Sequence, residues 1–154
     1  MWSGTIGAHP DSAGYRRRAD WVFTNRRGGV SQGEFESLNL AAHVGDDEML
    51  GSPPASLAFI DAEHGHNVYR ITEHSLQPEG KCDGLVTKSA DIALVALAAD
   101  CTPIVLADTK NAVVGVVHCG WRGVVAGIVP ATIEAMLGLG AECASMAAIV
   151  GPAI

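Results

Sequence analysis

Apolar residues gather in short, nearly continuous runs in the second half of the chain, and polar residues fall between them. Residues 92–98, 103–107 and 112–118 form three such runs. Runs of this kind predict strands that are buried on both faces. A polar turn at residues 108–111 separates the last two runs, so we expect them to pair as a hairpin. Pro103 opens its strand, where a missing N–H costs least.

The first half of the chain is less regular. Residues 1–20 are polar, and we expect them to form a flexible segment ahead of a domain that spans residues 21–154. Residues 21–23 predict a short strand, and a Gly-rich turn follows that either lines a pocket or simply closes a hairpin. Pro53 precedes and Pro54 opens residues 54–60, which we expect to form the first turns of a helix. Residues 67–71 alternate as a strand does.

After Gly120 the apolar positions recur at helical spacing, which predicts a helix. Pro130 removes a helical hydrogen bond, so we expect either a kink there or a restart with Pro130 in the first turn. Gly138 and Gly140 should end the helix, and residues 146–150 read as one more buried strand. These elements predict an α/β fold, a single domain with a mixed sheet flanked by helices.

Length and charge narrow the classes of function. A chain of 154 residues is typical of one domain. Its net charge of −7 gives no broad attraction for nucleic acid or an anionic membrane, and the basic clusters at residues 16–18 and 26–27 are small. Residues 1–15 lack the apolar core of a signal peptide, and no apolar run is long enough to cross a bilayer. We therefore expect a cytosolic protein.

Cysteine and histidine side chains provide the candidate chemistry. In a reducing compartment the four cysteines should be thiols or ligands, and Cys82, Cys119 and Cys143 lie among small or apolar residues, as buried inert thiols do. Cys101 and His118, by contrast, come near the ends of two neighbouring predicted strands. A thiol and an imidazole at the same end of a sheet can share a metal ion or a proton.

A catalytic zinc ion takes three protein ligands and keeps one position open. Cys101 and His118 are two candidates, and spacing alone does not decide which histidine is the third, the alternatives being His43, His64, His66 and His74. Asp100 is expected to hold the loop or orient a ligand. Arg122 lies at a helix entry, where an anion such as phosphate is favoured. Alternatively, Arg122 pairs with a surface carboxylate while Trp121 packs in the core.

Several separated motifs resemble one known family. Residues 83–87 read DGLVT, residues 99–103 read ADCTP, residues 118–123 read HCGWRG and residues 151–154 read GPAI; upstream, residues 23–31 read FTNRRGGVS and residues 37–40 read SLNL. Their identity and order resemble the YfiH family. Its members were first called multicopper polyphenol oxidases or laccase-like proteins, and are now described as purine nucleoside phosphorylases with adenosine deaminase side activity.

The resemblance implies a zinc site formed by His64, Cys101 and His118. It also implies phosphorolysis of adenosine, inosine, guanosine or methylthioadenosine to the base and ribose 1-phosphate, with deamination of adenosine as a second activity. We further expect Arg26 and Arg122, aided by the helix start after Gly123, to hold phosphate or ribose oxygens. Ser31 and Asn39 should line the nucleoside pocket.

The chain departs from the family pattern in three places. Ala62 and Glu63 stand where the family has Gln-Val, and Cys119 replaces an alanine, adding a thiol near the metal that can compete for it or oxidise. Family members also continue past the GPAI motif, so we expect a truncated chain that dimerises or is poorly stable as a monomer. Two alternatives remain open: copper-dependent phenol oxidation, and a catalytically incomplete fragment that acts through binding or assembly.

Overall fold

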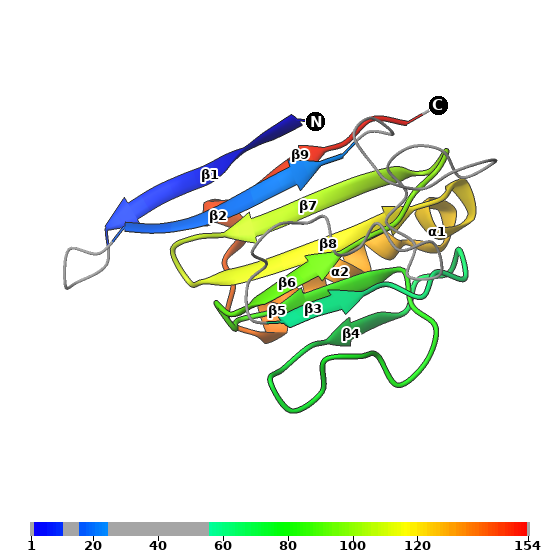
Figure 1. The fold of residues 1–154 in the computed structure, drawn as a ribbon, viewed down its shortest axis with the longest axis horizontal. Coiled ribbons are helices and arrows are strands. Elements are labelled where there is room, and N and C mark those ends of the chain that lie inside the picture. Colours follow the sequence, from blue (N-terminus) through cyan, green and yellow to red (C-terminus); the bar gives the residue numbers. More distant parts are fainter. Residues whose placement is uncertain (1, 11–15, 25–55, 154) are drawn as a thin grey trace, which may run out of the picture.

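The computed structural model describes residues 2–10, 16–24 and 56–153, and Figure 1 shows the arrangement of their helices and strands. The strands are β1 (Trp2–Pro10), β2 (Arg16–Phe23), β3 (Ser56–Phe59), β4 (Val68–Arg70), β5 (Gly84–Thr87), β6 (Ile92–Val95), β7 (Thr102–Asp108), β8 (Val113–Cys119) and β9 (Met146–Val150). The helices are α1 (Trp121–Ala126), α2 (Ile128–Gly138) and the short 3₁₀ helix η3 (Cys143–Ser145).

A five-stranded mixed sheet forms the centre of the fold, with the strand order β4-β5-β8-β7-β9. β4 runs parallel to β5, and the other neighbours are antiparallel. The predicted hairpin is confirmed: β7 and β8 pair along their length, with Pro103 opposite His118 and Asp108 opposite Val113. This register brings the end of β8 beside the start of β7 at one end of the sheet.

Both faces of this sheet are covered by other elements. Successive side chains of a strand point to opposite faces, so neighbouring residues of one strand pack against different elements. Leu85 and Val116 pack with β3 and β6 on one side, whereas Val86 and Val117 pack with α2 on the other. The result is three layers, with the helices on one face of the sheet and the β3-β6 pair on the other (Figure 1). The α/β prediction of a mixed sheet flanked by helices is confirmed.

The helical region is divided into two helices at Gly127, which has φ +91°. A residue with a side chain rarely adopts this left-handed conformation, so glycine suits the junction. α2 restarts at Ile128, and Pro130 is its third residue, where no helical N–H partner is lost. The alternative of a restart is therefore the correct one. α2 ends at Gly138, as predicted.

Several local predictions are wrong. β9 covers the predicted residues 146–150, but its side chains are half-buried or exposed, with Val150 63% exposed, so it is not a buried strand. The segment expected to be flexible over residues 1–20 instead contains β1 and the start of β2, which pair as an antiparallel hairpin. Residues 56–59 are a strand and not the start of a helix, because they pair in parallel with β6. β6 itself ends at Val95 and, among the strands that the structure describes, pairs only with β3; its side chains beyond Ile92 are half-buried instead of enclosed on both faces.

The cysteines divide as predicted, with one exception. Cys82 and Cys119 are buried, whereas Cys143 is exposed because it lies in η3 on the surface. The prediction for Cys143 is therefore wrong. Within the described part of the chain, none of the helices is both long enough and apolar enough to cross a bilayer.

Candidate metal centre

Three segments that are distant in sequence meet at one end of the central sheet. Cys101 immediately precedes β7, and His118 is the penultimate residue of β8. Because Thr102 is paired with Cys119, the antiparallel register places Cys101 across from Gly120. His64 lies in the loop ahead of β4, and its φ of +64° is unusual for a residue with a side chain.

The side chains of His64, Cys101 and His118 converge. Their ligand atoms, one from each residue, all lie within 4.8 Å of one another. The two imidazole rings are 5.0 Å apart between centroids and are nearly perpendicular, at 83°. His118 is buried, Cys101 is half-buried and His64 is exposed, so the group opens toward solvent on the side of His64.

This convergence shows which of the candidate histidines belongs to the group, a choice that sequence spacing alone could not make. His64 belongs to the group. His66 is exposed in the same loop outside the group, and His74 lines a different hollow, with Arg70 and Lys88. His43 lies outside the described residues.

Gly120 provides the space in which the group assembles. A Cβ atom at this position would lie 2.7 Å from Cδ2 of His64 and 3.2 Å from Sγ of Cys101. The backbone of Gly120 is ordinary, with φ −70° and ψ 151°, so the requirement for glycine is steric and not conformational. Gly123 plays a similar part for the loop, because a Cβ there would lie 2.7 Å from the carbonyl oxygen of Gly65.

The buried carboxylate of Asp83 forms hydrogen bonds with two of the three segments that supply the converging side chains. Asp83, immediately before β5, is fully buried, and its Oδ1 lies 2.8 Å from Nδ1 of His118. The same oxygen accepts the backbone N–H of His64 at 3.0 Å. Oδ2 accepts the backbone N–H groups of Gly65 at 2.7 Å and Glu63 at 3.3 Å.

These hydrogen bonds keep Asp83 ionised. Burial opposes the charged form, but the contact with His118 and the N–H donors of Gly65, Glu63 and His64 outweigh it, so the pKa of Asp83 lies below its ordinary value. Sequence reasoning assigned no role to Asp83, although it opens the DGLVT motif. The signal was an acidic residue directly before a mostly apolar strand, where a charge is costly unless it is paired.

Cys119 does not join the group. Its side chain packs with the buried residues beneath α2, on the opposite face of the strand from His118. Burial, together with the negative charges of Cys101 and Asp83, raises the pKa of Cys119 to about 11. The raised pKa makes the thiolate, the form that binds metal, harder to reach, and the position on the opposite face keeps Cys119 out of the group.

The other predicted site residues lie farther out or outside the described chain. Asp100 and Arg122 are exposed, and the guanidinium of Arg122 lies 5.3 Å from the centre of the Trp121 ring. Trp121 is 72% exposed, so the alternative that placed it in the core is wrong. α1 begins at Trp121 and not after Gly123, so Arg122 is in its first turn. Arg26, Ser31 and Asn39 lie outside the described residues.

Two shallow hollows on the described chain lie away from this group. One, of about 290 Å³, is lined by Trp21, Phe23, Ile149, Val150 and Pro152. The other, of about 270 Å³, is lined by residues at the ends of β4 and β5. Neither contains His64, Cys101 or His118. The chemistry of the donor atoms, and not the depth of a cavity, therefore identifies the candidate site.

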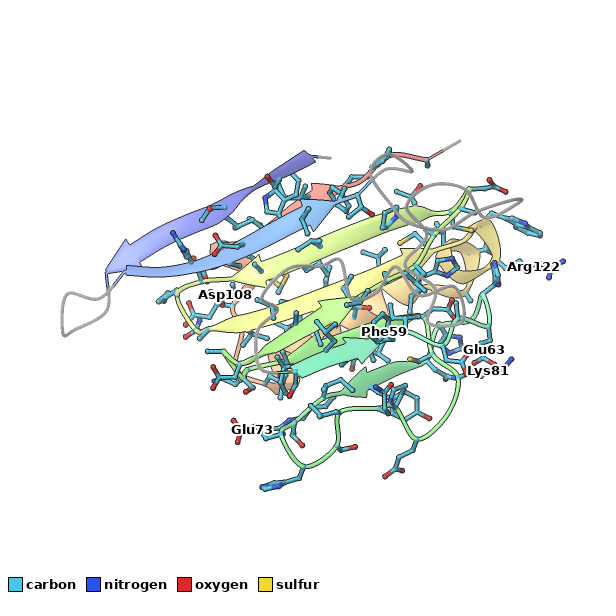
Figure 2. The ribbon with its side chains drawn as sticks, in the orientation of Figure 1. Phe59, Glu63, Glu73, Lys81, Asp108 and Arg122 are labelled. Atoms are coloured by element: carbon cyan, nitrogen blue, oxygen red, sulfur yellow. The ribbon has the colours of Figure 1, made fainter. Side chains whose placement is uncertain are left out.

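The donor set fits a metal ion. Two imidazole nitrogens and one thiolate are the number and kinds of ligand that catalytic zinc sites use, and soft thiolate also suits copper. Nδ1 of His118 is engaged by Asp83, so Nε2 is the ring nitrogen left to face the group. Figure 2 shows Glu63, Lys81 and Arg122 at this same end of the molecule.

Comparison with known proteins gives consistent results. A family model described as multi-copper polyphenol oxidoreductase laccase matches residues 20–154. The chain is 38% identical over 149 residues to a purine nucleoside phosphorylase of Streptomyces coelicolor, an alignment covering 88% of this chain and 62% of that protein. It is 33% identical over 159 residues to a purine nucleoside phosphorylase of Mycobacterium tuberculosis, covering 96% of this chain and 64% of that one.

Solved structures show the same fold. The Bacillus licheniformis hypothetical protein YfiH superposes with a TM-score of 0.73 at 27% identity, and YlmD from Geobacillus stearothermophilus with 0.71 at 29%. Each superposition covers 84% of this chain and 56% of the other. The chain thus spans about three-fifths of the length of the relatives it matches.

Proposed function

The chain belongs to the family of multi-copper polyphenol oxidoreductase laccases, also known by its YfiH members, and we propose that it is a zinc-dependent purine nucleoside phosphorylase. The observation that carries the proposal is the convergence of His64, Cys101 and His118 within 4.8 Å. Relatives at 33–38% identity bear the name purine nucleoside phosphorylase, which supports the reaction class.

The three converging residues would hold the metal, with Asp83 supporting His118 from behind. When bound, zinc supplies Lewis acidity that polarises an oxygen of substrate or water. The proposed substrates are adenosine, inosine, guanosine and methylthioadenosine, which with phosphate give the free base and ribose 1-phosphate. Deamination of adenosine is proposed as a second activity, because hydrolysis at the purine ring needs an activated water.

Arg122 is proposed to bind phosphate. It follows His118 by only four residues, and its exposed guanidinium is oriented by the Trp121 ring 5.3 Å away. A guanidinium matches phosphate oxygens in geometry as well as charge. Arg26, Ser31 and Asn39 stay predicted contacts for phosphate and nucleoside, and Asp100 a predicted residue for orienting a ligand.

Release of hypoxanthine from inosine, with and without phosphate in the buffer, tests the proposal. We expect phosphate-dependent release that disappears on chelation of metal and in Cys101→Ser. Cys143→Ser is the matched control, because this exposed cysteine lies in η3 and outside the group. Metal bound without any turnover of the four nucleosides would contradict the proposal and favour a binding or assembly role.

Arg122→Ala should raise the KM for phosphate more than the KM for inosine. Arg70→Ala, also an exposed arginine but at the other hollow, provides the control for loss of surface charge. Equal phosphate KM values in wild type and Arg122→Ala would remove Arg122 from the phosphate site.

A second candidate function is copper-dependent phenol oxidation, which the description of the matching family favours. It is weaker, because oxidases with several coppers need many histidines and the chain has six in total. Elemental analysis of the purified protein, with a phenol-oxidation assay before and after copper loading, separates the two functions. The predicted cytosolic location and dimerisation stay predictions, the latter measurable by light scattering.

A further inference from the structure

We propose that Asp83 is a positioning residue that presets both histidines of the metal centre before any metal binds. The inference rests on the proposed metal site. It goes beyond that site, however, because it assigns a function to a carboxylate that is not itself among the three converging ligands. Three features of the hydrogen bonding carry it.

The first feature is the contact with the His118 ring. Oδ1 of Asp83 lies 2.8 Å from Nδ1 of His118, and both side chains are buried. An ionised carboxylate only accepts hydrogen bonds, so Nδ1 carries the proton. In the neutral imidazole, Nε2 then keeps its lone pair and can bind a metal ion.

The second feature is the set of hydrogen bonds between the Asp83 carboxylate and the loop that contains His64. Three successive backbone N–H groups, at Glu63, His64 and Gly65, donate to the two oxygens of Asp83. His64 has φ +64°, a conformation that costs free energy for a residue with a side chain. The carboxylate therefore supplies the hydrogen bonds that keep the loop in this turn, which points the imidazole of His64 at Cys101.

The third feature is that the backbone of Asp83 joins the same two segments. Its N–H donates to the carbonyl of Asn67 at 3.0 Å, and its carbonyl accepts the N–H of His118 at 2.8 Å. Asn67 in turn donates from Nδ2 to Glu63 at 2.6 Å. The backbone of Asp83 is thus hydrogen-bonded to both segments, which fixes the position of its carboxylate relative to both imidazoles.

Asparagine is the informative substitution, because it keeps the shape of aspartate but has only one acceptor oxygen. If its NH₂ group takes the place of Oδ1, it faces Nδ1 of His118 and the N–H of His64. If the NH₂ group takes the place of Oδ2, it faces the N–H groups of Glu63 and Gly65. Whichever way the amide turns, Asp83→Asn therefore removes either the acceptor that keeps the proton on Nδ1 of His118 or the acceptor for two N–H groups of the His64 loop.

A measurement on the metal-free wild type tests the first step without any variant of Asp83. Long-range ¹H–¹⁵N spectra of histidine report which ring nitrogen carries the proton, and the His118 signals are assigned by their loss in His118→Gln. We expect the Nδ1–H tautomer. A predominant Nε2–H tautomer in the metal-free wild type would overturn the proposal.

Metal affinity tests the consequence. We expect Asp83→Asn to weaken binding of Zn²⁺, measured by competition with a chelator, by about 10- to 100-fold. The absorption bands of bound Co²⁺ should shift in energy, because the histidine ligands are no longer held in place. Asp108→Asn is the matched control, because Asp108 is also fully buried and also accepts from several donors through both oxygens.

The outcomes separate this inference from the proposed function. Equal Zn²⁺ affinity and equal Co²⁺ spectra in wild type and Asp83→Asn would overturn the positioning role. Equal loss in Asp83→Asn and Asp108→Asn would also overturn it, since the effect would then be general destabilisation. A wild type that binds neither ion would remove the metal site, and the tautomer of His118 would still decide whether Asp83 sets its protonation.

Discussion

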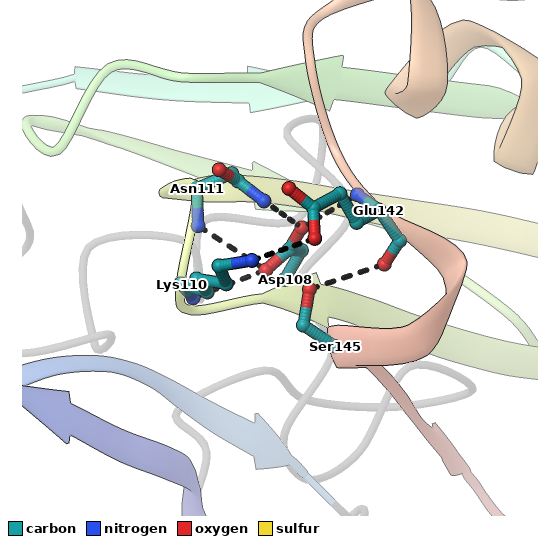
Figure 3. Close-up of polar contacts among 5 residues, drawn as sticks. All are labelled: Asp108, Lys110, Asn111, Glu142 and Ser145. Carbon is teal, nitrogen blue, oxygen red and sulfur yellow. Dashed lines mark hydrogen bonds and ion pairs between the residues drawn. The ribbon is translucent and has the colours of Figure 1, made fainter.

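Asp83 and Asp108 are two buried aspartates whose carboxylates accept several hydrogen bonds but have different roles in the molecule. Each is fully buried, and each accepts hydrogen bonds from several donors in neighbouring segments. Asp108 ends β7 and accepts from the backbone N–H groups of Lys110, Asn111 and Glu142 and from the side chain of Asn111, as Figure 3 shows. Asp83 instead directs one contact to an imidazole ring.

The difference lies in what the partners can still do. The N–H groups around Asp108 have no further capacity once they are bonded, so this carboxylate only ties the β7-β8 turn to the segment after α2. Ser145 adds a bond to the carbonyl of Glu142, which closes the same corner. His118 keeps a second ring nitrogen beyond its bond to Asp83. A buried carboxylate can therefore support a metal site when its partner keeps a second atom, here the other ring nitrogen, that can bind a ligand.

The largest effect on Zn²⁺ binding is expected from Gly120→Ala. This variant tests whether the metal centre requires the space that the absent side chain of Gly120 leaves beside His64, in addition to the hydrogen bonds of Asp83. The added methyl would lie 2.7 Å from Cδ2 of His64 and 3.2 Å from Sγ of Cys101, so the two ligands cannot keep their present positions. We expect Zn²⁺ binding to fall below detection by chelator competition. Gly138→Ala is the control, because a Cβ there meets nothing within 4 Å, and it should leave binding intact.

Asp108→Ala should cost about 3 kcal/mol in the free energy of unfolding, because several buried N–H groups lose their acceptor together. Zn²⁺ affinity should not change. Urea denaturation of the metal-free protein measures the first quantity. Asp91→Ala, at an exposed aspartate, should change stability little. A stable Asp108→Ala that nevertheless binds zinc weakly would erase the distinction between the two aspartates.

The stability that Asp108 contributes should depend on pH. Hydrogen bonds from Asn111 and Glu142 outweigh burial and lower the pKa of Asp108 from 3.8 to about 2. A lowered carboxyl pKa stabilises the fold fully above 3.8, and this stability is lost as pH falls through about 2. The shift corresponds to about 2 kcal/mol.

Urea denaturation of wild type and Asp108→Asn between pH 7 and pH 2 measures this contribution. Their difference in unfolding free energy should narrow as the pH falls, since only the wild type has this carboxylate to protonate. Asp83 also titrates with a lowered pKa, but it is present in both proteins and cancels in the difference. A constant difference across the range would show that the charge of Asp108 is unimportant.

The smallest effect should come from the ion pair at the edge of the Asp108 corner. Nζ of Lys110 lies 2.7 Å from Glu142, but both side chains are more than half exposed, and water screens such pairs. Lys110→Ala should therefore change the thermal midpoint less than any variant of Asp108. Differential scanning calorimetry at low and high salt measures this, and a large, salt-sensitive loss would show that the pair supports the corner.

The local pattern of residues by itself determined much of this protein. The apolar runs and the polar turn at residues 108–111 predicted the β7-β8 hairpin, and Gly138 and residues 146–150 predicted the end of α2 and strand β9. Residue type and strand ends also indicated Cys101 and His118 as neighbours. These properties follow from side-chain periodicity and turn chemistry, which a few adjacent residues carry.

Tertiary structure decided the rest, because it depends on pairings between segments far apart. Residues 56–59 became a strand only through parallel pairing with β6, and spacing could not select His64 from four histidines. The sequence likewise gave no means of identifying the partners of the Asp83 carboxylate. The hydrogen-bond partners of this carboxylate lie 18 to 20 residues before it and 35 residues after it, and only the folded sheet brings them within hydrogen-bonding distance.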